Sequence, residues 1–118
     1  MAFYCNVYAA DVVATWDHDG QNCDGYTLYW KKTTDADWQW NKSVAGSDTR
    51  EMTVMPEEYF ESDVEYTFTV VAHSNDYGDS EESNHATFTR VGGGFPFPAD
   101  NLPVLQFTVP NLPSDLNI

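Results

Sequence analysis

The residues best suited to chemistry in this sequence are carboxylates in two polar, glycine-containing stretches, 17–25 and 75–82. Their acids are Asp17, Asp19 and Asp24 in the first stretch and Asp76, Asp79, Glu81 and Glu82 in the second. Clustered carboxylate oxygens are the ligands that Ca²⁺ prefers. The Asp17-x-Asp19-Gly20 spacing lacks the third ligand and the distal glutamate of a calcium loop. A solvated acidic surface is the alternative, and a formal charge of −14 favours it.

Other groups that could take part in catalysis do not form a pattern. His18, His73 and His85 lie in or beside predicted loops, and no serine or cysteine sits in a nucleophile motif. The two cysteines, Cys5 and Cys23, have neither metal-ligand spacing nor a C-x-x-C arrangement. We therefore expect neither enzymatic activity nor a cofactor.

Trp38 and Trp40 are two residues apart, so in a strand they share one face. If that face is outward, the two indoles form a flat platform that stacks on sugars or anchors a protein interface. If it is inward, they close the core. Both alternatives are compatible with the sequence.

Composition limits the partners. The chain has 118 residues, 15% of them aromatic, and 19 acidic residues against 5 basic ones. Such a surface repels phosphate groups, so we expect no nucleic-acid or anionic-membrane partner, and a charged partner should be basic. The N-terminal residues resemble no secretion signal and no window is apolar enough to span a membrane, so we expect synthesis in the cytoplasm.

The elements that must position these side chains are short strands. Alternating apolar and polar residues with many aromatic and β-branched side chains predict strands. Seven are expected, at 3–9, 12–16, 26–33, 38–44, 50–55, 65–73 and 85–91. Seven short strands separated by turn signals indicate an all-β fold, an antiparallel β-sandwich, over residues 1–91.

At this point the pattern resembles the fibronectin type III family. Trp16 matches the inward tryptophan of the second strand, and Tyr66 is placed like the tyrosine corner at the turn into the sixth. The resemblance implies core or corner positions for Trp16, Tyr26, Leu28, Trp30, Phe60, Tyr66, Phe68 and Val70. Tyr77-Gly78-Asp79-Ser80 resembles the loop before the last strand, but Tyr77 replaces the arginine of the adhesive motif that some members carry.

The resembled fold has further implications for the loops. It would place the two acidic stretches at one end of the sandwich, with Cys5 and Cys23 near that end. A disulfide between them is then one alternative, and two reduced thiols are the other, expected without export.

The composition changes after Gly92-Gly-Gly94, because five of the six prolines lie in the last 27 residues, 92–118. This segment is predicted to be a glycine-hinged, extended C-terminal arm. Its apolar residues are Phe95, Phe97, Leu102, Val104, Leu105, Phe107, Val109 and Leu112. The arm can dock on a neighbouring molecule or fold back on its own sandwich, and proline-bracketed extension favours docking on a neighbour.

These observations lead to a hypothesis about function. We expect a non-enzymatic structural protein of a bacteriophage virion, a capsid decoration or tail accessory protein, that contacts copies of itself or a major capsid or tail protein through its arm. The alternative is a carbohydrate- or cell-surface-binding adhesion module that uses Trp38, Trp40 and the acidic loops. A lone sandwich domain with an acidic surface and an apolar arm is compatible with both, because this fold does not determine function.

Overall fold

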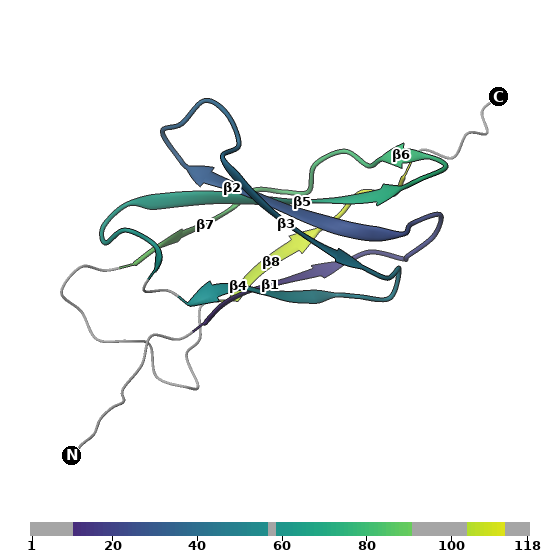
Figure 1. Cartoon of the computed structure of the whole chain (residues 1–118), viewed down its shortest axis with the longest axis horizontal. Helices are drawn as coiled ribbons and strands as arrows, with labels where there is room; N and C mark the ends of the chain where they lie inside the picture. The colour runs from purple at the N-terminus through teal and green to yellow at the C-terminus, as the bar shows by residue number, and fades with distance from the viewer. Residues whose placement is uncertain (1–10, 57–58, 91–103, 113–118) are drawn as a thin grey trace, which may run out of the picture.

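A computed structural model describes residues 11–56, 59–90 and 104–112, which form two β-sheets packed face to face (Figure 1). The strands are β1 (Asp11–Asp17), β2 (Gly25–Lys32), β3 (Trp40–Ala45), β4 (Glu51–Pro56), β5 (Glu65–Ser74), β6 (Gly78–Asp79), β7 (Ala86–Thr89) and β8 (Val104–Thr108). One sheet has the order β4-β1-β8 and the other β3-β2-β5-β6, with β7 also pairing with β5. The predicted all-β sandwich is confirmed. The strand predicted at 3–9 lies outside the described residues.

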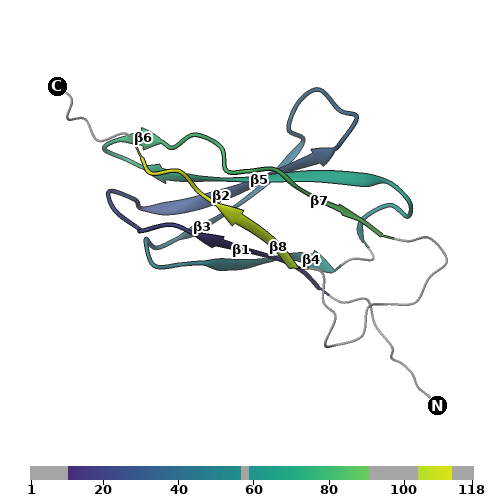
Figure 2. The ribbon, with the colours of Figure 1, turned by 180° about the vertical axis from the view of Figure 1, so that it is seen from behind.

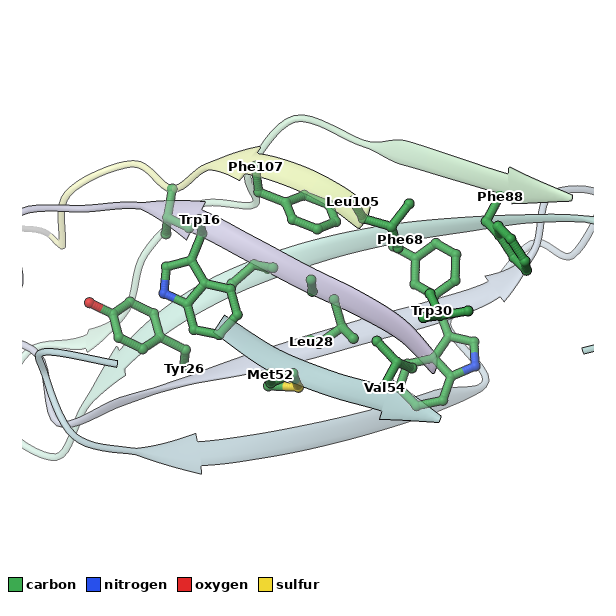
Figure 3. Close-up of a cluster of buried hydrophobic side chains, with 14 of the residues drawn as sticks. Trp16, Tyr26, Leu28, Trp30, Met52, Val54, Phe68, Phe88, Leu105 and Phe107 are labelled. Atoms are coloured by element: carbon green, nitrogen blue, oxygen red, sulfur yellow. The ribbon is translucent and has the colours of Figure 1, made fainter. Parts of the chain in front are cut away.

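Alternation in the sequence accounts for the inner faces of the two sheets. Val12, Ala14 and Trp16 of β1 are buried while the residues between them are half-buried, and β2 repeats the pattern. Figure 3 shows side chains from both sheets meeting between the layers. All eight residues predicted for the core or the corner are buried.

Aromatic rings fill the core from end to end. At one end Trp16 packs on Tyr26, with ring centroids 5.1 Å apart. At the other, Phe60 makes edge contacts with Phe68, at 5.9 Å, and with Tyr66, at 4.9 Å. The Tyr66 hydroxyl accepts a hydrogen bond from the backbone N–H of Glu61 at 3.0 Å, which holds the turn into β5. Tyr66 therefore has the geometry of a tyrosine corner.

Strand β5 is buried on both faces, which its alternating sequence did not predict. Thr67, Thr69 and Val71, which alternate with the core residues of this strand, are 7% exposed or less. Thr69 lies opposite Tyr29 and hydrogen-bonds Ser83. A central strand needs no polar face when neighbouring segments cover it and its hydroxyl groups find partners.

Residues 80–85 continue along β5 between β6 and β7 without regular strand pairing. Ser80 and Ser83 donate their backbone N–H groups to the carbonyls of Ala72 and Val70, at 2.8 and 3.0 Å. Their hydroxyl oxygens accept the N–H groups of the same two residues, at 3.0 and 2.9 Å. Two serine side chains thus replace backbone acceptors at this edge of β5.

The described part of the predicted arm is a strand of the sandwich, so the expectation of an extended arm is wrong for residues 104–112. β8 pairs in parallel with β1, and Figure 2 shows it running beside β1 at the edge of the smaller sheet. Leu105, Phe107, Val109 and Leu112 are 4–6% exposed, whereas Val104 is 46% exposed. Alternating apolar side chains gain more from this nearby core than from water. Phe95, Phe97 and Leu102 lie outside the described residues.

If β8 is part of the core, Phe107→Ala should destabilise the protein strongly. Phe107 lies beside Trp16 in register, and truncating a buried phenylalanine costs about 3–5 kcal/mol. We expect a lower urea midpoint for unfolding, followed by tryptophan fluorescence. Gln106→Ala, at an exposed neighbouring position, is the control and should change stability by less than about 0.5 kcal/mol. Equal midpoints for the two variants would show that β8 does not pack on the sandwich.

Candidate interaction surfaces

The seam between β1 and β8 is the first candidate surface. Val13 to Asp17 lie opposite Val104 to Thr108 in register. The pairing continues past the strand, because the N–H of Val109 donates to the Asp17 carbonyl at 3.0 Å. In Figure 3, Leu105 and Phe107 point from β8 into the core. This seam combines main-chain pairing with apolar burial, which is how an added strand binds to a sheet edge.

The Asn84 side chain holds the outer edge of β8. Its Nδ2 donates to the Gln106 carbonyl at 3.3 Å, and its Oδ1 accepts the N–H of Thr108 at 2.7 Å. A residue of a neighbouring parallel strand opposite Phe107 would make the same two bonds with its backbone. Asn84 therefore imitates a strand peptide and satisfies an edge that would otherwise be open to pairing.

A buried histidine lies where the chain leaves β1. The backbone N–H of Gly20 donates to His18 Nδ1 at 2.9 Å, so Nδ1 is the acceptor nitrogen of a neutral ring. The Tyr26 hydroxyl oxygen lies 2.9 Å from His18 Nδ1. It accepts a hydrogen bond from Arg50 Nη1 at 3.0 Å and donates one to the Ser47 carbonyl at 3.0 Å. Burial raises the pKa of Tyr26, which stays neutral in this network.

The other nitrogen of His18, Nε2, is buried and makes no hydrogen bond of normal geometry. His18 lines a surface hollow together with Val109 and Pro110, the residues that follow β8. Desolvation lowers the pKa of His18 from its usual 6.5, and the positive charge of Arg50 lowers it further. Asp19, the Pro110 carbonyl and Asp17 raise this pKa and oppose the effect in part. The pKa of His18 therefore depends in part on Pro110, in the segment that follows β8.

The carboxylates considered as calcium ligands do not gather into one cluster in the described loops. Among the described residues, no three histidine, cysteine or acidic side chains come together in a way that could hold a metal ion. Asp19 and Asp24 use carboxylate oxygens to accept the N–H groups of Gln21, at 2.8 Å, and Asn75, at 2.7 Å. Asp17, Asp76 and Asp79 are exposed, and these acids act as turn caps or surface charge in the described loops.

The thiol of Cys23 is half-buried and donates to the Gly25 carbonyl at 3.1 Å. Cys5, which would be its partner if the two cysteines formed a disulfide, lies outside the described residues.

Trp38 and Trp40 do not form a common platform, because they lie on opposite faces of the larger sheet. Trp38 precedes β3 and contacts Tyr29 at 6.5 Å and His85 at 5.4 Å between ring centroids, with Lys31 Nζ over its ring. Trp40 stacks on the core residue Trp30 at 6.3 Å. Residues two apart share a face only within a regular strand, and β3 begins at Trp40.

Trp40 instead belongs to an aromatic pocket at the edge of the sandwich. The pocket has a volume of about 260 Å³ and is lined by Trp30, Trp40, Met55, Tyr59 and Tyr66. Trp30 and Tyr66 form its buried wall, whereas Trp40 is 42% exposed and Tyr59 is 66% exposed. An apolar recess rimmed by exposed tryptophan and tyrosine is typical of sites that bind another molecule.

Sequence reasoning missed three of these features. Asn84 gives no signal, because an asparagine in a polar loop has no predictable partner across 22 residues. The sequence around His18 indicates only a loop residue, because Val109 and Pro110, which line the same hollow, are far away in the sequence. Tyr59 was overlooked beside Phe60, although two adjacent aromatics in a connection imply that one of them faces outward.

Comparison with known proteins identifies the family. The model of the fibronectin type III domain matches residues 3–89, well over half of the chain, and the chain belongs to this family. Searches of curated proteins and of solved structures returned no significant match. The family and the sandwich define a protein-interaction or binding module. In the described residues, no helix has the length and apolar character needed to cross a membrane.

The lowered pKa of His18 predicts a pH-dependent stability. Because the folded protein binds this proton less tightly than the unfolded chain does, the stability gained from a neutral His18 is complete above pH 6.5 and is lost as pH falls through the lowered pKa. His18→Gln should show a smaller loss of urea stability below pH 6.5 than the wild type. Gln21→Ala, which changes an exposed and uncharged side chain of the same loop, is the control and should keep the wild-type pH dependence. Parallel pH profiles for wild type and His18→Gln would contradict this assignment.

Proposed function

We propose that this chain is a non-enzymatic structural module of a multi-copy assembly, and that β8 joins neighbouring copies by completing the β1 edge of the next molecule. The observation that supports the proposal most is the parallel addition of β8 to β1. A strand that binds a sheet edge through its main chain can bind the same edge of a second copy with identical contacts. Thirteen residues, 91–103, lie between Arg90 and the first residue of β8.

The energetics of β8 support an exchange between copies. Burying the four apolar side chains of residues 104–112 contributes about 1.5–3 kcal/mol each. Ordering nine backbone residues costs about 1–2 kcal/mol each, and each hydrogen bond returns about 1 kcal/mol. The opposing contributions are of similar size, so β8 can leave its own β1 at a lower cost than unfolding the whole sandwich. A change of partner then requires only that the neighbour's groove be present at a comparable effective concentration.

Composition supports the setting that we propose for this assembly. A formal charge of −14 suits a surface that faces solvent and away from packaged nucleic acid. A bacteriophage virion, with the chain as a decoration or tail accessory protein made in the host cytoplasm, is the setting we favour. The flat two-tryptophan platform of the adhesion hypothesis is absent, so we do not extend that hypothesis.

Cysteine trapping tests the exchange. Thr15 and Gln106 lie directly opposite each other across the seam, which is within disulfide reach. In a Cys5→Ser, Cys23→Ser background, chains carrying only Thr15→Cys are mixed with chains carrying only Gln106→Cys and oxidised with glutathione disulfide. Exchange predicts a covalent dimer of unlike chains on a non-reducing gel, increasing with protein concentration. Thr27→Cys on β2 replaces Thr15→Cys in the control mixture for random collisions.

The Asn84→Ala variant sharpens the result. Loss of the Asn84 bonds to β8 should weaken docking by about 1–2 kcal/mol and speed the appearance of the mixed dimer several-fold. A chain with both Thr15→Cys and Gln106→Cys reports that the register is correct by closing as a monomer. If that chain closes while the mixture never exceeds the Thr27→Cys control, β8 is fixed in its own molecule and the proposed joint does not exist.

A further inference from the structure

The edge of the sandwich away from β8 carries a second feature that the proposed joint does not use. Among the described residues, β3 pairs with β2 alone and β4 with β1 alone, so each ends its sheet. Five of the six residues of β3 are exposed. The aromatic pocket opens at the first of them, Trp40. A free strand edge and an apolar recess therefore adjoin each other.

Lys42 makes the edge formed by β3 differ from the edge formed by β4 in the hydrogen-bonding groups that remain open. Its Nζ crosses from β3 to donate to the carbonyls of Thr53, at 2.6 Å, and Val54, at 3.5 Å, on β4. This bridge keeps the two sheets together and occupies acceptors of β4. Because β3 pairs with β2 alone among the described residues, the outer edge of β3 is where an incoming backbone can form hydrogen bonds.

The chemistry of the pocket limits what can fill it. Its volume of about 260 Å³ is below the range of roughly 300–1,000 Å³ for whole small-molecule ligands, so one bulky side chain is a better match. Trp30 and Trp40 present stacked rings to this recess. Lys32 lies opposite Tyr66 in register, and its charge is paired with Glu61, at 2.7 Å between Nζ and Oε2. The chain as a whole keeps a net charge of −14.

From these features we infer that β3 and the aromatic pocket together bind an extended peptide segment of a partner protein. The segment adds to the free edge of β3 as a strand, inserts one aromatic or leucine side chain between Trp40 and Tyr59, and carries basic residues beside it. Main-chain pairing supplies affinity, the pocket supplies specificity, and the acidic surface attracts the basic residues. This inference is independent of β8 exchange, because the two sites lie at opposite edges of the sandwich.

The test uses a phage-displayed library of random dodecapeptides selected on the full chain, with enriched sequences then made as synthetic peptides. We expect peptides with one bulky apolar residue and basic neighbours, whose binding is measured by calorimetry. Trp40→Ala and Tyr59→Ala should each weaken binding at least about 10-fold, as hot-spot residues do. Trp38→Ala is the matched control, because it removes a tryptophan two residues away on the opposite face, and should leave binding unchanged.

Backbone methylation separates strand addition from simple insertion into the pocket. Peptides N-methylated at alternate amides, in the two possible sets, should differ, with one set abolishing binding and the other tolerated. Equal binding by both sets would overturn strand addition. Failure of the library to enrich peptides that depend on Trp40, or Trp40-dependent binding to a glycan array in its place, would overturn the assignment of a peptide partner.

Discussion

The packing of Leu105 and Phe107 against β1 is the contact on which the rest of the structure depends. The smaller sheet would otherwise consist of β1 and β4 alone, with the core open beside Trp16. A two-stranded sheet is marginal in water, and a third strand with an apolar face gives it independent stability. The same contact places Val109 and Pro110 near His18, so the chemistry of one loop end depends on a segment about ninety residues away. The seam between β1 and β8 therefore contributes to the stability of the sandwich and also carries the proposed function.

The two lateral edges of the sandwich are managed in different ways. On the β8 side, side chains replace missing backbone partners, with Ser80 and Ser83 on β5 and Asn84 on β8. On the opposite side, Lys42 ties β4 to β3 but leaves the main chain of β3 exposed. Natural sheets normally protect such edges from unwanted pairing. An edge left open beside exposed tryptophan and tyrosine has the character of a recognition surface.

Much of the fold could be predicted from the sequence, because its causes are local. Period-two alternation placed Trp16, Leu28 and Phe68 in the core, and the spacing around Tyr66 indicated the corner. The destination of residues 104–112 could not be predicted this way. Alternating apolar residues require a sheet edge to pair with, but the pattern does not indicate whether that edge belongs to the same chain or to a neighbour. The prolines favour an extended segment, and an extended segment can also dock on the chain's own β1.

The candidate sites were less accessible to sequence reasoning than the fold. The Trp38–Trp40 platform failed because its geometry assumed a strand beginning two residues too early. The pocket that replaced it joins residues from β2, β3, β4, β5 and the connection before β5, a set that no spacing rule brings together. Asn84 likewise gains its role from the position of β8, and His18 shares its hollow with residues that follow β8. Function in this chain depends on long-range contacts, whereas the fold depends mostly on local pattern.

Amide hydrogen exchange, followed residue by residue by NMR in the intact chain, tests most directly whether β8 is part of the sandwich. We expect the N–H groups of Thr108, bonded to Asn84, and Val109, bonded to Asp17, to exchange far more slowly than those of an unstructured peptide. Their protection should be intermediate between the exposed loops and the centre of β5, because a strand at the edge of a sheet opens locally at a lower free energy than a central strand. Exchange of both amides at unstructured rates, with β1 and β5 still protected, would contradict the account.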